Sequence, residues 1–461
     1  MRVFLFLIVL LFYGCNSTIT SSTSDDVVVV SDPMVDTKLV VVGDEFTNND
    51  YIYSIPNDTV INTDVAKVAY RESSIPMLVV LVNYNNIQIK STPLVWSDKL
   101  FGKNEHQLND YYLEVSNGKF EFEKAKESYG DIDDGVVSVK LDRNHPNIDI
   151  SSLSFSSKVY PDLSDSLKLA NNYIDFSNYD SDGDGHITSN ELILTFIIAG
   201  YEDSYEGRHV SNGIWAHQYC TSPSYTPTLD GVTIMGCEDQ GKYALFGEKH
   251  NIMNPKDATI GIIAHELAHT AFSLPDLYNT ADTSSGGIGF FGLMGAGSWA
   301  VQNGFEPAGN TPTHLSAWCK VFLGWITPVE DLGFVYLNET SSDDSNIVKI
   351  PISANHYYLL ENRNNSGYDK GLYSLAGIFN GGIAIWHINE NRLTYENLAY
   401  NSVNIYTDDK GVDLVEARDT GLDYNTNGGE RALFYSPNIT AFGTKITDIS
   451  QRGSMMSLNI N

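Results

Sequence analysis

Basic residues are scarce in this chain, and their scarcity excludes several kinds of partner. Its 461 residues include 28 Lys and Arg against 58 Asp and Glu, a formal net charge of −30 at pH 7. A surface this acidic repels phosphate backbones and anionic lipid headgroups, so we expect neither nucleic acid nor an anionic membrane surface as a partner. Most of the acidic side chains fit an ordinary solvated surface, and some are available to bind cations.

Cysteine is scarce as well, with four residues in the whole chain. No two of them have zinc-finger spacing, which excludes a structural zinc site of that kind. Cys220 and Cys237 stand in a loop-rich stretch and are candidates for a disulfide in an oxidising compartment. Cys319 lies among apolar neighbours, where we expect a buried thiol.

Long apolar runs are missing after the N-terminus. The run Val3–Tyr13 follows Arg2 and is too short to span a bilayer, which is typical of a signal peptide over residues 1–15. It ends in Gly14-Cys15, which resembles the bacterial lipobox, so Cys15 is a lipidation candidate. Two locations stay open: a lipoprotein at the cell surface or outer membrane, anchored only by that lipid, and a secreted protein. Both lie outside the cytoplasm.

The length of the chain predicts more than one domain. Its residue composition and pattern change twice after the predicted signal peptide. Residues 16–73 are rich in Ser, Thr, Asp and Asn and are predicted to form a tether or pro-segment. In residues 74–330, Ile75–Asn83 indicates a buried strand, and Asn109–Gly118 indicates a helix that ends at Asn-Gly. Strands that alternate with helices predict an α+β domain there.

The last 131 residues, 331–461, have a different pattern. Strand runs such as Tyr357–Glu361 and Gly382–His387 alternate with turns rich in Asn, Gly and Asp. No amphipathic helix is evident in this stretch. The pattern predicts an all-β accessory domain at the C-terminus.

The most informative segment is His265-Glu-Leu-Ala-His269, which follows the apolar stretch Ile260–Ala264. Imidazoles four residues apart project from one face of a helix, one turn apart, so both can bind one metal ion. Glu266 is then placed to take a proton from a water molecule that the metal polarises. The alternative is a core helix with two histidines that have structural partners.

A second metal motif is the acidic loop 180–191, which matches the EF-hand template at every specified position. A helix within residues 163–173 can precede it, but the stretch after it, Leu192–Ala199, is β-branched and apolar and predicts a core strand. A single loop before a core strand favours a structural calcium site over a sensor. The predicted ligands are the side chains of Asp180, Asp182, Asp184 and Glu191 and the backbone carbonyl of His186.

Several stretches that follow the two histidines, and others around them, occur together in one known family. They include Thr270–Tyr278, Gly289–Trp299, Leu323–Pro328, Val115–Gly118, Ile214–His217, Glu361–Arg363, Ile385–Ile388 and Ile446–Ser450. From about Ser74 to Asn461 the chain thereby resembles the immune inhibitor A family of secreted bacterial zinc metallopeptidases. The resemblance implies a zincin fold, with a twisted sheet above the cleft, the histidine helix below it and an edge strand that pairs with the substrate. It also implies a Met-turn beneath the metal, for which Met294 is the candidate.

The third zinc ligand departs from the pattern of related families. They place an acid or a histidine six residues after the second histidine, with a Gly between to reverse the chain, whereas here Asp276 comes seven residues after His269 and no Gly intervenes. We assign Asp276 as the third ligand and expect Pro275 to end the helix before it. Two alternatives stay open. Asp276 could orient an imidazole or bind backbone in the turn, with Glu248 or Asp282 as the ligand.

These observations predict an exported, calcium-stabilised zinc endopeptidase, a monomer that acts on proteins or peptides, with a catalytic domain over residues 74–330. Zinc bound by His265, His269 and Asp276 would activate water, and Glu266 would act as the general base. The alternative is a non-catalytic, calcium-binding surface module for adhesion or binding on a zincin scaffold. Loss of the histidines or of the glutamate would favour the module, and all three are present.

Overall fold

The computed structural model describes residues 37–39, 54–56 and 74–461, except 153, 282–284, 331, 376, 378, 419–420, 425 and 430. The predicted signal peptide, Cys15, most of the predicted tether and Asp282 lie outside the described residues. Two short strands within residues 16–73, β1 (Thr37–Leu39) and β2 (Ser54–Pro56), pair with each other in antiparallel fashion. Among the described residues, no helix has both the length and the apolar character needed to cross a membrane.

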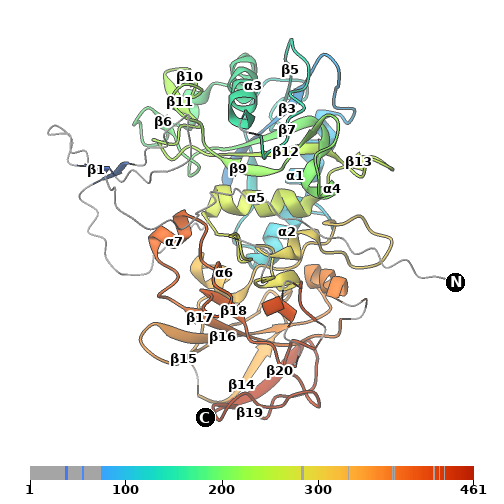
Figure 1. Ribbon diagram of the computed structural model, residues 1–461, viewed down its shortest axis with the longest axis vertical. Helices are drawn as coiled ribbons and strands as arrows, with labels where there is room; N and C mark the ends of the chain where they lie inside the picture. The colour runs from blue at the N-terminus through green and yellow to red at the C-terminus, as the bar shows by residue number, and fades with distance from the viewer. Residues whose placement is uncertain are drawn as a thin grey trace.

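An eight-stranded sheet forms the upper half of the molecule in Figure 1. Its main path is β13-β12-β7-β3-β4, with β5 beside β3, β8 beside β7 and β9 beside β12. The central strands β3, β7 and β12 run parallel. Their bounds are β3 (Ile75–Asn83), β4 (Phe122–Lys124), β5 (Val136–Lys140), β7 (Ile193–Glu202), β8 (Gly213–Ile214), β9 (His217–Tyr219), β12 (Tyr243–His250) and β13 (Lys256–Asp257).

Both faces of this sheet are covered, which explains why β3 is apolar at nearly every position. Successive side chains of a strand point to opposite faces, so Val79 belongs to one buried cluster and Val80 to the other. The first cluster includes residues of α1 (Pro93–Phe101), α2 (Leu108–Val115) and α5 (Ile260–Phe272). The second includes residues of α3 (Phe155–Ala170).

A small sheet with the order β10-β11-β6 lies beside the acidic loop. Strand β6 (His186–Ile187) comes from the loop itself and pairs in parallel with β11 (Val232–Ile234), which pairs with β10 (Thr228–Leu229). The short helix η1 (Phe176–Tyr179) precedes the acidic loop, and α4 (Asp203–Glu206) directly follows β7.

The C-terminal region contains two further sheets, in the orders β15-β16-β17-β18 and β14-β20-β19. The preceding segment carries η2 (Gly289–Phe291), η3 (Ala296–Trp299) and α6 (Ala317–Phe322). The strands are β14 (Gly333–Asn338), β15 (Val348–Pro351), β16 (His356–Arg363), β17 (Gly382–Asn389), β18 (Val412–Leu414), β19 (Ile446–Thr447) and β20 (Met455–Ile460).

This region also contains helices that the prediction of an all-β region did not include. They are η4 (Gly367–Leu375), α7 (Tyr395–Ala399) and η5 (Gly421–Tyr424). A helix as short as the five residues of α7 completes little more than one turn, so it leaves no apolar periodicity in the sequence. The first buried cluster continues into this region through Trp386 and Leu433, so a single core spans residues on both sides of position 330.

Candidate metal centre

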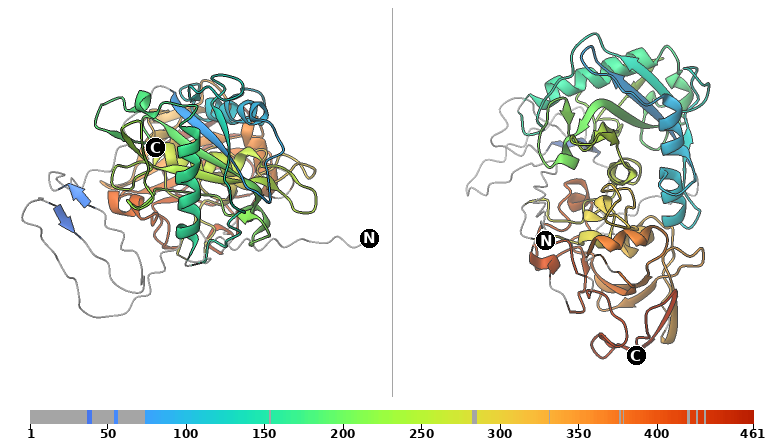
Figure 2. Two further views of the ribbon diagram at one scale, coloured as in Figure 1. Left: turned by 90° about the horizontal axis from the view of Figure 1, so that it is seen from above. Right: turned by 90° about the vertical axis from the view of Figure 1, so that its right-hand side faces the viewer.

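Helix α5 carries both histidines and lies below the large sheet in Figure 1. All its residues are buried. The helix lies between the sheet and the C-terminal region, as Figure 1 and the right-hand view of Figure 2 show. Gly261 lets its first turn lie against η3, where a Cβ atom at that position would meet the Ser298 carbonyl oxygen at 1.9 Å. The Tyr112 hydroxyl of α2 donates to the Ala264 carbonyl at 2.7 Å and fixes the other side of the helix.

The two imidazoles face each other one helical turn apart, with their Nε2 atoms separated by 3.2 Å. The Nδ1–H of His265 donates to the Leu293 carbonyl at 2.9 Å, and that of His269 donates to the Leu274 carbonyl. These bonds fix the tautomer of each ring, so both Nε2 lone pairs are available at the same point. This is the arrangement that two histidine ligands of one metal ion require.

The helix ends at Phe272, and Ser273 reverses the chain with a φ of 53° in the left-handed region. The expectation that Pro275 ends the helix was therefore wrong. The Ser273 N–H bonds to the His269 carbonyl and satisfies the end of the helix in the usual way of a left-handed cap, with Ser in place of Gly. Pro275 follows two residues later.

Beyond this turn, Asp276 reaches back to the histidines. Its Oδ1 atom lies 3.0 Å from His265 Nε2 and 3.3 Å from His269 Nε2. All three side chains are buried, and their ligand atoms form one of the two groups of described His, Cys, Asp and Glu residues that could hold a metal ion. Two neutral imidazoles and one carboxylate are a donor set that suits zinc.

The charges of the three groups are strongly coupled. Burial opposes a charged imidazole, but the hydrogen bond and charge of Asp276 outweigh it and raise the pKa of His265 to about 9. Burial also disfavours a charged carboxylate, yet the two imidazoles hold the pKa of Asp276 far below its usual value. The cluster thus stabilises a positive charge between its three ligand atoms, which is what a divalent cation would provide.

Glu266 lies beside the first histidine and contacts the rim of the large sheet. Its carboxylate accepts the backbone N–H of Gln218, in β9. Burial raises the pKa of Glu266, while both imidazoles oppose the shift. Strand β9 runs antiparallel to β12 at the side of the sheet, so Glu266 stands between helix α5 and a strand at the sheet margin. Nothing in the sequence had singled out Gln218.

Of the alternative ligands, Glu248 is buried in another place. Its Oε1 atom accepts the backbone N–H of Lys90 at 3.0 Å and lies 3.1 Å from the Lys249 ammonium.

Met294, the Met-turn candidate, is fully buried, and its carbonyl accepts the N–H of Leu277 at 2.8 Å. Because Leu293 holds His265 and Met294 holds the residue after Asp276, this short segment connects two of the three candidate ligands.

The acidic loop brings Asp180, Asp182 and Asp184 together in the second group that could hold a metal ion. Glu191 is not part of that group, because its carboxylate accepts hydrogen bonds from the N–H and hydroxyl groups of Ser181 and Thr188. The ring of His186 points elsewhere, with Nδ1 lying 3.0 Å from an oxygen of Asp239. As expected, a strand rather than a helix follows the loop, namely β7.

The cysteines have separate roles. Cys220 and Cys237 form a disulfide, with Cα atoms 4.9 Å apart, in the stretch after β9. Cys319 is a buried thiol in α6, and burial raises its pKa to about 12. Burial therefore keeps this thiol protonated at neutral pH.

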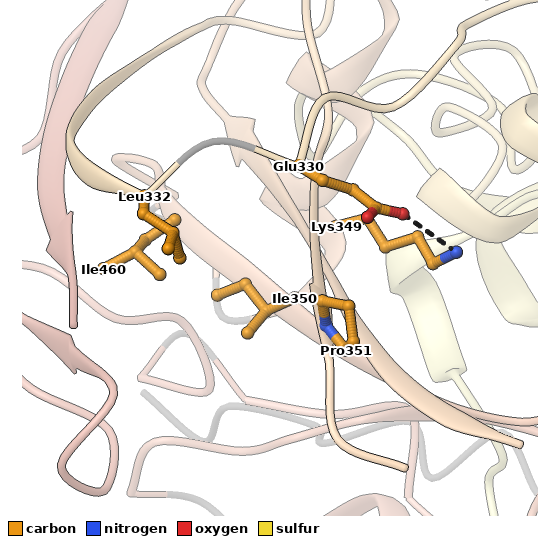
Figure 3. A pocket seen from close by; sticks show the side chains of 6 residues that line it. All are labelled: Glu330, Leu332, Lys349, Ile350, Pro351 and Ile460. Carbon is orange, nitrogen blue, oxygen red and sulfur yellow. Dashed lines mark ion pairs between the residues drawn. The ribbon is translucent and has the colours of Figure 1, made fainter. Parts of the chain in front are cut away.

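A surface pocket of about 220 Å³ lies in the C-terminal region, beside β15 and the end of β20, as Figure 3 shows. Apolar side chains form most of its wall, and an ion pair between Glu330 and Lys349 closes one side at 3.2 Å. None of the residues with predicted roles lines it. The buried histidine cluster, rather than this pocket, is the candidate site.

Comparison with known families agrees with the site geometry. The model of the immune inhibitor A peptidase M6 catalytic domain matches residues 95–326, which is half of the chain. The chain belongs to this family. An immune inhibitor A peptidase is a zinc metallopeptidase with a zincin-like fold, so family membership implies a catalytic zinc ion, and the His265–His269–Asp276 group is available to hold it.

Named relatives support the same enzyme class. Over 150 residues the chain is 28% identical to the pre-pro-metalloprotease PrtV of two strains of Vibrio cholerae serotype O1. The match covers 32% of this chain but 15% of PrtV, so this immune inhibitor A peptidase corresponds to a small part of those relatives.

Solved structures give a weaker likeness. Wild-type OgpA from Akkermansia muciniphila is 13% identical, with a TM-score of 0.27 over 72% of this chain and 95% of OgpA. The inactive OgpA in complex with an O-glycopeptide substrate is 14% identical, with a TM-score of 0.24 over 72% and 94% of the two chains. These TM-scores are too low to support an argument about fold or substrate.

Proposed function

We propose that this protein is a zinc endopeptidase in which His265 Nε2, His269 Nε2 and Asp276 Oδ1 hold the metal. The observation that carries the proposal is the convergence of these three buried atoms, each pair within 3.3 Å, with both imidazole tautomers fixed. Zinc bound there would act as a Lewis acid that lowers the pKa of a water molecule and polarises the scissile carbonyl.

Glu266 acts as the general base in this proposal. Its carboxylate takes a proton from the attacking water and passes it to the leaving amine. The Gln218 N–H orients that carboxylate, and its burial favours proton uptake. We place the substrate backbone along β9, since this strand lies at the sheet margin beside Glu266 and an extended peptide can add to such a strand.

The variant Glu266→Gln tests the function. It removes the base and leaves the three ligands in place, so cleavage of casein should fall by at least about 100-fold while one zinc per chain is retained. Zinc content by mass spectrometry and a casein assay, with and without a zinc chelator, check this result. A parent protein without zinc, or a variant that cleaves casein as fast as the parent, would refute the proposal.

We also propose that the acidic loop binds one structural calcium ion through Asp180, Asp182 and Asp184. The support is the EF-hand pattern together with the grouping of the three carboxylates. Glu191 would join them only after release of its bonds to Ser181 and Thr188. Millimolar calcium should raise the melting temperature of the parent and not that of Asp182→Ala. Equal shifts in the two proteins would contradict the assignment.

Export is the third part of the proposal. The apolar run before Cys15 and the Cys220–Cys237 disulfide both suit a protein outside the cytoplasm. Cell fractionation tests it: the protein should be found in the membrane fraction if Cys15 is lipidated and in the medium if it is not. Recovery from the cytosol would contradict export.

A further inference from the structure

Asn401 contacts the third candidate ligand from a distant part of the chain. It lies two residues after α7, in the C-terminal region and beyond the residues that match the family model. Its Oδ1 atom accepts the backbone N–H of Asp276 at 2.6 Å, and its Nδ2 donates to Asp276 Oδ2 at 2.5 Å. The side chain therefore holds both the backbone and the carboxylate of Asp276.

The two oxygens of Asp276 thus have separate partners. Oδ2 accepts a hydrogen bond from the side-chain amide of Asn401, whereas Oδ1 faces the two imidazoles. A carboxylate held in this way can offer only one oxygen to a metal ion, and it cannot rotate without losing a hydrogen bond inside a buried site. The contact fixes the direction from which Asp276 would ligate.

Asn401 is itself held firmly. Its φ of 54° lies in the left-handed region, which Asn tolerates better than most residues. The Thr280 hydroxyl donates to its carbonyl at 2.8 Å. Three residues later, the Asn404 amide donates to the carbonyls of Leu277 and Val412, at 2.9 and 2.8 Å. The segment 401–404 is therefore tied to the Asp276 segment on one side and to β18 on the other.

We propose that Asn401 is a positioning residue for the zinc site, which it serves by orienting Asp276. The inference rests on the proposed function, because it assumes that Asp276 ligates zinc. The turn at Ser273 contains no Gly and carries one residue more than related families use. Asn401 supplies the constraint that this longer turn lacks, and so the C-terminal region completes the metal centre.

A purely structural role would give a different result, and Asn397 offers the matched control. It lies in α7, and its amide side chain bonds within its own segment, to the Arg392 carbonyl and the Ser402 hydroxyl. Asn397→Ala removes a similar number of hydrogen bonds from the same segment without touching Asp276. If Asn401 only stabilised the segment, the two alanine variants would behave alike.

The experiment measures zinc affinity of the full chain by competition with a chromophoric chelator, in a Glu266→Gln background that prevents self-digestion. Asn401→Ala should bind zinc about 10–100-fold more weakly than the parent, as is typical when a group that orients a ligand is lost. Asn401→Gly, which accepts the left-handed conformation, should show the same loss, and Asn397→Ala should bind like the parent. The absorption bands of the cobalt-loaded protein should change in the two Asn401 variants alone.

The outcomes separate this inference from the proposed function. Zinc affinity of the Asn401 variants equal to that of the parent would overturn the inference and leave the zinc site intact. Equal weakening in Asn397→Ala would also overturn it, in favour of a structural role. A parent that binds no zinc would overturn both. Melting of the metal-free proteins shows whether each variant is folded, and Asn401→Gly remains decisive if the alanine variant is not.

Discussion

Residues 74–326 and residues 333–461 contribute to the metal centre in different ways. The first region supplies every side chain that we expect to touch the metal or the substrate, on helix α5 and the turn after it. The second region supplies bonds to the segments that carry those side chains. Arg363 donates to the Phe291 carbonyl at 2.6 Å, and Asn401 holds Asp276. The first region provides the chemistry and part of its geometry, and the second region adds further bonds that hold the site in place.

The buried charges of β16 show how this support reaches the site. Arg363 is fully buried and pairs with the carboxylate of Asp369. The Oδ1 atom of Asp369 also accepts the backbone N–H of His314. The His314 carbonyl accepts the N–H of Leu293, whose own carbonyl accepts His265 Nδ1–H. A continuous set of hydrogen bonds thus leads from the C-terminal region to the first histidine. The boundary near residue 330 therefore divides the sequence but not the site.

The largest effect should follow from loss of the buried arginine. Arg363→Met leaves Asp369 buried without its cation, whereas Glu361 keeps its ion pair with the buried Lys320. The free energy of unfolding should therefore fall by about 3–5 kcal/mol. Urea denaturation of the zinc-free protein measures it. Arg392→Met is the control, since Arg392 pairs with Asp409, which is half exposed, and should lose less than about 1 kcal/mol. If the two variants lost the same free energy of unfolding, the buried Arg363 network would stabilise the protein no more than an exposed ion pair does.

Substitution of two glycines with positive φ should distinguish the cost of a strained backbone alone from the added cost of a steric clash near the site. Gly287 has a φ of 60°, and a Cβ atom there would meet the Leu277 carbonyl oxygen at 2.0 Å. Gly333 has a φ of 86° with no atom within 4 Å of its Cβ position. Gly333→Ala should cost about 1–2 kcal/mol. Gly287→Ala should cost more than about 3 kcal/mol, because it also displaces the segment after Asp276.

Urea denaturation compares the two glycine variants, and chelator competition shows whether zinc binding changes with stability. Weaker zinc binding is expected for Gly287→Ala alone. If both variants lose the same stability and keep the affinity of the parent, the segment after Asp276 is not held as tightly as its contacts indicate.

The smallest expected effect is on the pH dependence of the free energy of unfolding. Burial lowers the pKa of His217 to about 4, below the value of about 6.5 in an unfolded chain. Between these values the unfolded state binds more protons, so stability falls as the pH falls, by at most about 1.4 kcal/mol per pH unit for one histidine. His217→Gln should flatten the dependence of unfolding free energy on pH between 6 and 5. An unchanged slope would show that His217 is not buried as a neutral ring.

The Arg363–Asp369 pair of the second region should respond at lower pH than His217. Although burial opposes it, Arg363 holds the pKa of Asp369 well below its usual value. The stability from this pair is therefore present above the unfolded carboxyl pKa of about 3.9 and is lost as the pH falls further. Unfolding curves recorded from pH 7 to pH 3 for the parent and Arg363→Met should differ least at the acid end.

Regular elements could be predicted from the sequence where their patterns are local. The run Ile75–Asn83 is β3 as expected, and the helix predicted to end at Asn-Gly is α2, followed by Asn117 and Gly118 with positive φ. The predicted strands in the C-terminal region correspond to β16 and β17. Each strand is a run of mostly buried residues, and the helix shows its buried face within two turns, so a short window of sequence contains the pattern.

The sequence by itself determined the pair of imidazoles and the adjacent carboxylate, because helical geometry relates residues four apart whatever surrounds them. It also indicated the acidic loop, whose predicted ligands lie within twelve consecutive positions. Only the tertiary structure decided how Asp276 approaches the histidines, through a left-handed Ser273 and the amide of Asn401. Asn401 is 125 residues away from Asp276, and no local pattern records a contact at that separation. Such contacts form only when the chain packs, and they set the geometry of the site.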